Sequence, residues 1–271
     1  MRGMTVEIQP SELLKKIRRA TDPACETALK YFGKVQGELK PDKTYMTEAD
    51  TEIETLLMKK LPKIIEGSVV VGEETAPDRA ATRELKRREF VWVIDPIDGT
   101  ASFIDGLPMF CICVGLMRAG ELYAGVLRFP ATGEIYEAVR GYGAFYNGKR
   151  IRIDAKTELR HEAPIYVPPK AHLKYKIAYT GKTRSIGSAA AHVAMVSRGA
   201  ALASVANAYL WDFAAAAAIL TEAGGELRYL DGKRVNWPSL IASREKLRMP
   251  VLAAERSRWR DVASMIKFIG K

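Results

Sequence analysis

The 271-residue sequence predicts a protein of mixed α and β structure, α+β in its first half and α/β in its second. Three observations support this fold class. Residues 11–33 and the segment after Thr47 carry apolar residues at helical spacing. Residues 109–151 contain β-branched and aromatic runs separated by turn residues, as in an antiparallel meander. Beyond residue 165, strand-like runs alternate with helices rich in small residues.

Two helices and two strands are expected in the N-terminal part. The first helix covers residues 11–33, with Pro23 as a candidate break because proline removes one helical hydrogen bond. The second begins near Thr47, since Thr47 and Asp50 have the spacing of a capping box. The strand-like runs SVVVGEE and FVWVID follow, the first ending in Gly72 and two glutamates and the second in Asp95. Both strands should therefore place carboxylates at their carboxyl ends.

The middle of the chain is expected to form the antiparallel meander. Its candidate strands are residues 109–117, 121–129, 134–139 and 143–151. The last run contains Asn147 and Gly148, a pair typical of a tight hairpin turn. A polar segment near residues 150–165 then marks a soft boundary, which divides the chain into domains of residues 1–155 and 156–271.

The second domain is expected to alternate helices and strands. Helices are predicted over SIGSAAAHVAMVSRG and DFAAAAAILTEAGG, and the second should end at Gly224 and Gly225. Strands are predicted at ALASVA, ELRYL and VLAAE, and a basic helix should close the chain. His192 lies in the first of these helices, where a packed or surface histidine is the expected role.

Composition excludes several classes of protein. With 48% apolar and 27% charged residues, the chain reads as an ordinary soluble globular protein, without a membrane span or a secretory signal, so a cytoplasmic location is expected. Three cysteines, Cys25, Cys111 and Cys113, are expected to be reduced core residues, the last two pointing the same way on one strand. The net charge of +10 favours anionic ligands, but the basic residues are scattered, so nucleic acid is not an expected partner.

The acidic residues at the ends of two predicted strands indicate a metal site. Glu73, Asp95 and Asp98 follow strand-like runs, and carboxylates about 4 Å apart repel each other by roughly 4 kcal/mol at an effective dielectric of about 20. Such a cluster needs cations. Oxygen ligands without histidine or cysteine nearby favour Mg²⁺, with Mn²⁺ as a possible substitute. Pro96 fixes the backbone after Asp95, which makes the Ile97 carbonyl a candidate ligand as well.

The segment DPIDGT has a second interpretation. Asp, Pro and Gly are all turn residues, so its spacing alone is as consistent with a turn as with a metal site. Gly99 and Thr100 begin a new segment, where free backbone N–H groups could hold a phosphate. A metal site and an anion site would then adjoin.

Three segments, in order and at suitable spacing, resemble the signatures of the inositol monophosphatase family. They are GEE at 72–74, WVIDPIDGT at 92–100 and WDFAAAAAILTEAGGEL at 211–227. TEAD, GAFYNGKRI and RSIGSAA also have counterparts, so the resemblance covers most of the chain. It implies a layered α-β-α-β-α sandwich of the type shared with fructose-1,6-bisphosphatases, a Mg²⁺-dependent phosphoric monoester hydrolase and a homodimer.

The resemblance also implies metal ligands. Glu73, Asp95 and the Ile97 carbonyl would hold one Mg²⁺, and Asp95, Asp98 and Asp212 a second. A third, weaker ion would sit near Glu73, which gives two to three ions in all. Most of these ligands lie in the first domain, and Asp212 in the second completes the site. Without the resemblance, Asp212 would be read as a helix N-cap.

Catalytic and substrate-binding residues follow from the same resemblance. Thr100 and Asp50, together with Glu73, would orient and deprotonate the attacking water. Helix capping alone would also explain Asp50. The phosphate would rest beside Asp98 on the amides of Gly99 and Thr100. Contacts to the organic part of the substrate would come from Gly187, Ser188, Ala189 and Asn207.

One departure from the family leaves the substrate open. Inositol-specific members carry a glutamate about seven residues before the aspartate of WD, where this chain has Val205, and Asn207 fits only if the loop is two residues shorter. The expected substrate is a small phosphorylated metabolite, either inositol-1-phosphate-like or a sugar phosphate. Fructose 1,6-bisphosphate, histidinol phosphate and a 3′-phosphoadenosine nucleotide are alternatives. A catalytically silent, basic regulatory or nucleic-acid-binding protein is the alternative of another class, and the intact acidic cluster argues against it.

Overall fold

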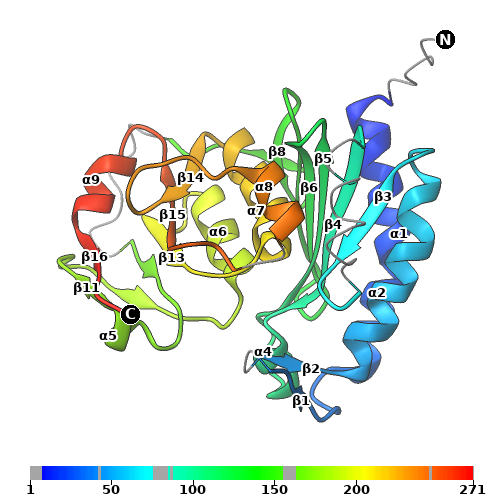
Figure 1. The fold of residues 1–271 in the computed structure, drawn as a ribbon, viewed down its shortest axis with the longest axis horizontal. Helices are drawn as coiled ribbons and strands as arrows, with labels where there is room; N and C mark the ends of the chain where they lie inside the picture. The colour runs from blue at the N-terminus through cyan, green and yellow to red at the C-terminus, as the bar shows by residue number, and fades with distance from the viewer. Residues whose placement is uncertain are drawn as a thin grey trace.

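Five layers, α-β-α-β-α, follow one another along the molecule, which confirms the predicted fold class (Figure 1). The computed structural model describes residues 8–41, 44–75, 85, 88–154, 163–243 and 246–270. The outer helical layer comprises α1 (Pro10–Tyr31) and α2 (Glu48–Lys60), which pack on one face of a seven-stranded sheet. The central layer comprises α6 (Ala189–Ser197) and α7 (Leu210–Glu222), which pack between the two sheets.

The predicted break at Pro23 is wrong, because α1 continues through it. Side-chain donors among the described residues reach carbonyls in the preceding turn, although not the Arg19 carbonyl, which Pro23 leaves without its helical donor. The Thr21 hydroxyl donates to the Ile17 and Arg18 carbonyls, at 3.0 and 2.9 Å, and the Arg128 guanidinium donates to the Arg18 carbonyl at 3.2 Å. The apolar face of α1 is buried on both sides of the proline, so packing also holds the helix together.

The first sheet contains the predicted meander. Its order is β3 (Val69–Gly72), β4 (Phe90–Asp98), β5 (Cys111–Arg118), β6 (Glu121–Phe129), β7 (Glu134–Val139), β8 (Gly143–Tyr146) and β9 (Lys149–Ile151). Only β3 and β4 pair in parallel. Asn147 and Gly148 both have positive φ, 48° and 74°, as the tight turn between β8 and β9 requires.

The second sheet lies entirely in the second half of the chain. Its order is β12 (Thr183–Arg184), β10 (Ile165–Tyr166), β13 (Ala203–Ala206), β15 (Val251–Glu255) and β14 (Gly225–Tyr229). Gly224, with φ 97°, follows the end of α7 as predicted. The expected closing helix is only partly correct, because the short helix α9 (Trp259–Ser264) is followed by β16 (Ile266–Phe268), which pairs with β11 (Tyr175–Ile177).

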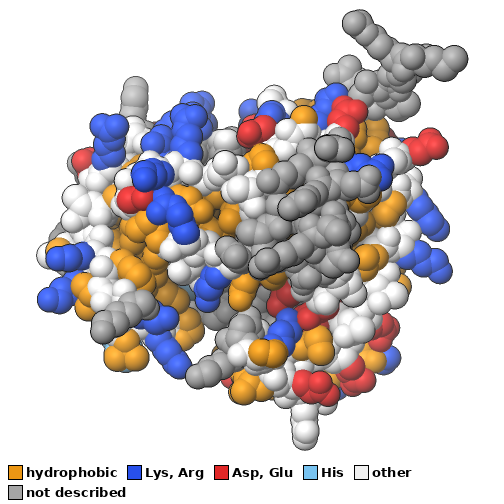
Figure 2. All heavy atoms as spheres, in the orientation of Figure 1, with side chains coloured by type: hydrophobic (Ala, Val, Ile, Leu, Met, Phe, Trp, Pro, Cys, Tyr) orange, Lys and Arg blue, Asp and Glu red, His pale blue; other side chains and the backbone are white. Residues whose placement is uncertain are grey.

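Short elements complete the described part of the chain. They are β1 (Glu38–Leu39), β2 (Tyr45–Met46), η1 (Leu61–Lys63), α4 (Thr100–Ile104), α5 (Ala171–Lys174) and α8 (Trp237–Ser243). The β1–β2 hairpin and α4 lie together at one end of the first sheet (Figure 1). Within the described residues, no helix has the length and apolar character needed to cross a membrane. Lys and Arg side chains occur at several separate places on the face shown in Figure 2.

The division into two domains stays a prediction. Strands of the first sheet precede residue 152 and those of the second follow residue 164, in agreement with a boundary near 155. However, α7 from the second half packs directly on the first sheet. An added Cβ at Gly115 would lie 2.8 Å from the Ala214 Cβ, and one at Gly125 would overlap the Ala215 carbonyl. The two halves therefore share one core.

Candidate active site

The acidic cluster forms where two parallel strands end beside a helix from the second half. Since β3 and β4 are parallel neighbours, Glu73 and the end of β4 lie at the same edge of the sheet. β4 does not stop at Asp95 as expected but continues to Asp98, with an irregular register between them. Asp212, in the first turn of α7, completes the group, and Asp95, Asp98 and Asp212 each offer an oxygen within 4.8 Å of the others.

In the metal-free protein, burial and mutual repulsion favour the neutral, protonated form of these carboxyl groups over the charged form. Asp95 is 1% exposed and Asp98 6%. Burial, followed by the charges of Glu73, Asp98 and Asp212, holds the pKa of Asp95 well above its usual range. The pKa of Asp212 is raised in the same way, first by burial and then by Asp98 and Glu73. A bound cation would remove this penalty.

Asp98 is also anchored to the start of α6. Its carboxylate accepts hydrogen bonds from the Ser188 hydroxyl at 2.6 Å, the Ala190 amide at 2.6 Å and the Ala189 amide at 3.3 Å. Burial still raises the pKa of Asp98, although these donors oppose the shift. Ser188 is itself fully buried, so the structure places it and Ala189 against Asp98. Their expected contact with a substrate stays a prediction.

Two glycines allow the segment after Asp98 to approach the loop before α6. Gly99 has φ 96°, and an added Cβ would lie 3.2 Å from the Ser188 Cβ and 3.4 Å from the Gly187 carbonyl. Gly187 has φ 87°, and a Cβ there would overlap the Ser102 hydroxyl. The predicted phosphate-binding and substrate-binding segments are therefore neighbours, although 88 residues of sequence separate their glycines.

Hydrogen bonds fix the backbone between Asp95 and Thr100. The Asp95 carboxylate accepts from the Ile97 amide at 2.9 Å, and the Thr100 hydroxyl donates to the Ile97 carbonyl at 3.0 Å. The turn character of this segment and its carboxylate cluster thus coexist, and neither interpretation excludes the other. The Ile97 carbonyl lies between two residues of the predicted site, and its role as a ligand stays a prediction.

Asp50 forms the capping box that the sequence predicted. Its Oδ2 accepts from the Thr47 amide and the Thr47 hydroxyl, both at 2.7 Å. Burial raises the pKa of Asp50 to about 6, against the opposing effect of these two hydrogen bonds. A carboxylate with this pKa is ionised at neutral pH and is still basic enough to accept a proton. Capping is therefore shown, and the catalytic role stays a prediction.

Lys40 was not anticipated from the sequence. Its ammonium lies 2.6 Å from an oxygen of Glu73 and 2.6 Å from an oxygen of Glu74, so the β1–β2 hairpin is tied to the end of β3. No spacing rule links a lysine to acids more than thirty residues away, so the pair could not be found from the sequence. Burial raises the pKa of Glu73 even though Lys40 opposes the shift.

Glu54 was also missed, and here a signal existed. It is 1% exposed and lies one helical turn after Asp50, on the buried side of α2. Its carboxylate accepts from the Glu74 amide at 2.9 Å, the Thr75 amide at 2.6 Å and the Thr75 hydroxyl. A Cβ at Gly72 would overlap this carboxylate. Glu54 therefore fixes the backbone that carries Glu73.

The structure separates the two candidates for a contact with the organic part of the substrate. Val205 lies inside β13, pairs with Leu252 and is fully buried, and its side chain has no polar atom that could bind a substrate hydroxyl. Asn207 follows β13 in the loop before α7. Its Oδ1 is buried and has no hydrogen-bond partner among the described residues. A ligand donor could satisfy this oxygen.

The donor set fits magnesium. Asp95, Asp98 and Asp212 supply hard carboxylate oxygens, and burial raises the pKa of each. Among the salt bridges of the described residues, only Glu73 of the predicted ligands has a cationic partner, Lys40. A divalent cation would therefore neutralise charge that the described side chains leave uncompensated. Mn²⁺ has similar ligand preferences.

Comparisons with known proteins agree with this chemistry. A model of the inositol monophosphatase family matches residues 9–260. The histidinol-phosphatase of Chlorobaculum parvum is 34% identical over 233 residues, which cover 82% of this chain and 85% of that protein. The inositol-1-monophosphatase of Mesorhizobium japonicum is 30% identical over 264 residues, covering 90% and 96%. An IMPase structure from Thermotoga maritima matches with a TM-score of 0.78 at 26% identity, over 94% of this chain and 96% of that one.

Proposed function

The chain belongs to the inositol monophosphatase family and is a phosphoric monoester hydrolase, and from that premise we propose which of its residues perform the reaction. The proposed reaction is Mg²⁺-dependent hydrolysis of a small phosphomonoester to an alcohol and inorganic phosphate. The observation that supports it most is the group of Asp95, Asp98 and Asp212, of which the first two are buried and the third half-buried, and whose oxygens lie within 4.8 Å of one another. Unpaired, such a group opposes folding.

The proposed metal ligands are Glu73, Asp95, the Ile97 carbonyl, Asp98 and Asp212, for two to three Mg²⁺ ions. When bound, Mg²⁺ supplies positive charge to the phosphoryl oxygens and lowers the pKa of a coordinated water. The protein supplies the positioning. Three donors at the start of α6 orient Asp98, the Tyr209 amide orients Asp212, and Glu54 fixes the backbone around Glu73. Held in this way, the carboxylates need no rearrangement during the reaction.

Asp50 and Thr100 are the proposed groups that orient and deprotonate the attacking water, together with Glu73. Both hydrogen bonds from Thr47 go to the Oδ2 of Asp50, so its Oδ1 is the atom that would accept the proton. A pKa of about 6 suits this role near neutral pH. The bond from the Thr100 hydroxyl to the Ile97 carbonyl orients that hydroxyl so that its lone pairs can accept from the water.

The phosphate is proposed to rest beside Asp98 on the amides of Gly99 and Thr100. The positive φ of Gly99 turns the chain sharply at this point. Gly187, Ser188, Ala189 and Asn207 are the proposed neighbours of the organic part. Of these, Asn207 has the clearest capacity for a ligand, because its buried Oδ1 is unpartnered within the described chain. A hydroxyl or amino group would satisfy it, which favours polyhydroxylated or amino alcohol phosphates.

A phosphate-release screen would identify the substrate. Inositol 1-phosphate, fructose 1,6-bisphosphate, histidinol phosphate and 3′-phosphoadenosine 5′-phosphate would be compared with and without Mg²⁺. The relatives named above include a histidinol-phosphatase and an inositol-1-monophosphatase, so both substrates belong in the first set. An Asn207→Ala variant should raise the KM of the preferred substrate and leave that of a minimal aryl phosphate unchanged. An equal rise in KM for both substrates would exclude Asn207 as a contact to the organic part of the substrate.

A homodimer in the cytoplasm is also proposed. Family members are often dimers, and sedimentation equilibrium should then give twice the 30.0 kDa of one chain. A mass of one chain at micromolar concentration would contradict the dimer. The location would be tested separately, by cell fractionation.

A further inference from the structure

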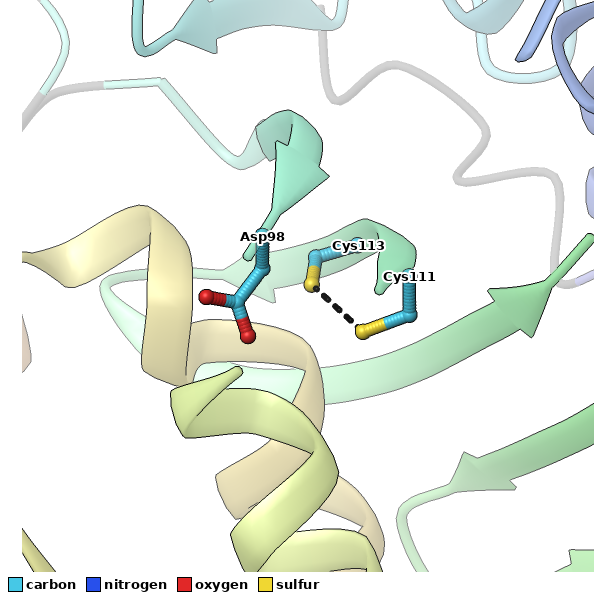
Figure 3. Close-up of side chains that lie close together, drawn as sticks. All are labelled: Asp98, Cys111 and Cys113. Carbon is cyan, nitrogen blue, oxygen red and sulfur yellow. Dashed lines mark hydrogen bonds between the residues drawn. The ribbon is translucent and has the colours of Figure 1, made fainter. Parts of the chain in front are cut away.

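Two buried thiols lie beside the candidate magnesium site and have no part in the proposed reaction. Cys111 and Cys113 occupy alternate positions of β5, so both side chains point to the same face of the sheet, as the sequence predicted. Both are fully buried, and their Sγ atoms are 3.7 Å apart. Figure 3 shows the pair next to the carboxylate of Asp98, which comes from the end of the neighbouring strand β4.

The spacing of these atoms suits a tetrahedral metal ion. Zinc–sulfur bonds of about 2.3 Å at a tetrahedral angle place two sulfur atoms about 3.8 Å apart. One oxygen of Asp98 and the two sulfur atoms all lie within 4.8 Å of one another, close enough for a small side-chain rotation to complete a three-ligand set. The Ser188 hydroxyl, 3.7 Å from the Cys111 Sγ, or a water could occupy the fourth position.

We propose that Cys111, Cys113 and Asp98 form a second metal site, selective for a thiophilic divalent cation such as Zn²⁺ or Cd²⁺. The selectivity comes from the ligands, because thiolates bind soft cations strongly and Mg²⁺ weakly. Asp98 is also a proposed magnesium ligand, so an ion bound to the thiols competes for it. Zn²⁺ therefore inhibits phosphate release. This inhibition rests on the proposed function, but the binding does not.

Proton balance gives the site a measurable signature. Each cysteine in the free protein carries its proton at neutral pH, since the ordinary pKa of a thiol is about 8.5. Binding of one ion forms two metal–sulfur bonds and releases two protons to the solvent. Binding to the carboxylates alone would release no thiol protons, so the thiols are identified by the two protons that the Cys111→Ala/Cys113→Ala variant fails to release. Simple packing of two core cysteines, the alternative role, would give neither the release nor a sulfur-to-metal absorption band.

Cadmium binding tests the site without any assay of activity. The Mg²⁺-free protein would be titrated with Cd²⁺ while the ultraviolet sulfur-to-cadmium charge-transfer band and proton release are recorded. We expect one Cd²⁺ per chain, with two more protons released from the wild-type protein than from the Cys111→Ala/Cys113→Ala variant. Cys111→Ala and Cys113→Ala should each weaken binding more than about tenfold. Cys25→Ala is the matched control, because Cys25 lies in α1 and should leave the titration unchanged.

Several outcomes would overturn the proposed site. These are no charge-transfer band in the wild-type protein, a band that survives in both the Cys111→Ala and Cys113→Ala variants, and a band that Cys25→Ala removes. The charge-transfer band and the absence of any proton release are observed on the wild-type protein, so both stay decisive even if a variant fails to fold. A release of no protons on Cd²⁺ binding would also exclude the thiols as ligands.

Inhibition is tested in a second arm. At saturating Mg²⁺, Zn²⁺ should inhibit the wild-type enzyme, and the doubly substituted Cys111→Ala/Cys113→Ala enzyme should keep its turnover and need more than about tenfold more Zn²⁺ for half-inhibition. Cd²⁺ binding without such a difference would overturn the competition for Asp98. Absence of phosphate release from every substrate would instead contradict the proposed function, and the cadmium titration would still decide the site.

Discussion

His192 lies buried between Tyr166 and the loop that precedes α6. It is 2% exposed, its ring stacks on Tyr166 with centroids 5.1 Å apart, and its Nε2 accepts from the Ile186 amide at 3.1 Å. The sequence suggested a packed or surface histidine, and the packed role is confirmed. Through Ile186, His192 supports the Gly187 turn that lies against Gly99 and Ser102.

Acid should therefore destabilise the protein through His192. Burial lowers its pKa from 6.5 to about 4, so the unfolded chain takes up the proton first as the pH falls. Stability contributed by neutral His192 is complete above about pH 6.5 and is lost by about pH 4, a change of about 3 kcal/mol. In urea unfolding of the metal-free protein, His192→Gln should lose less stability over this interval. An equal loss of unfolding free energy in the wild type and in His192→Gln would contradict the assignment of this pH dependence to His192.

Lys40 should weaken metal binding, because its ammonium occupies oxygens of Glu73 and Glu74. Lys40→Gln frees Glu73 and removes a positive charge near the cluster. We expect the Mg²⁺ concentration that gives half of the thermal stabilisation to fall severalfold. Lys34→Gln is the matched control, since it makes the same change of charge at an exposed position after α1. An unchanged or higher Mg²⁺ requirement for Lys40→Gln alone would show that Lys40 supports metal binding instead.

At the scale of elements, the end of β3 depends on α2. Glu54→Gln keeps the shape of the side chain but removes its charge and one acceptor oxygen from the Glu74 and Thr75 donors. We expect a loss of about 1–3 kcal/mol in unfolding free energy and weaker Mg²⁺ binding, because Glu73 is no longer held in place. Chemical denaturation and Mg²⁺ titration would measure the two effects. Glu66→Gln, the same change at an exposed position after η1, should have neither effect.

Close packing of α7 on β6 gives a second prediction for an element. A Cβ at Gly125 would overlap the Ala215 carbonyl in the backbone of α7, which cannot move aside as a side chain can. Gly125→Ala should therefore push α7 away from the first sheet and destabilise the protein by about 1–3 kcal/mol. Because α7 carries Asp212, apparent Mg²⁺ affinity should fall as well. An unchanged thermal midpoint would contradict this close approach.

The sequence predicted those elements whose signals are local. The meander and the Asn147–Gly148 turn follow from alternation and turn chemistry within a few residues. The capping box of Asp50 is equally local. By contrast, the contacts of Lys40 arise from folding of distant segments, and the continuation of α1 through Pro23 depends on packing against the first sheet. Such long-range contacts leave no spacing pattern in a single sequence.

At the scale of the whole molecule, the site exists only because both halves of the chain contribute to it. Asp95 and Asp98 come from the first sheet, whereas Asp212 and the three donors to Asp98 come from the central helices α6 and α7. The layered fold and the family were predictable because three signature segments occur together. The groups that orient the acids were not predictable, since Ala190 donates through its backbone amide and any residue other than proline could do the same.

Phosphate release by wild-type protein, Asp95→Asn and Asp212→Asn over a Mg²⁺ titration tests the central claim most directly. Asp231→Asn serves as the control. Asp231 lies in the turn after β14, outside the acidic cluster, and forms an ion pair with Arg248. We expect both cluster variants to lose at least about 10²-fold in turnover. Their metal-free thermal midpoints should be no lower than that of the wild type, since each removes a repelling charge. Normal Mg²⁺-dependent turnover in either cluster variant would contradict the claim that these clustered carboxylates form the catalytic metal site.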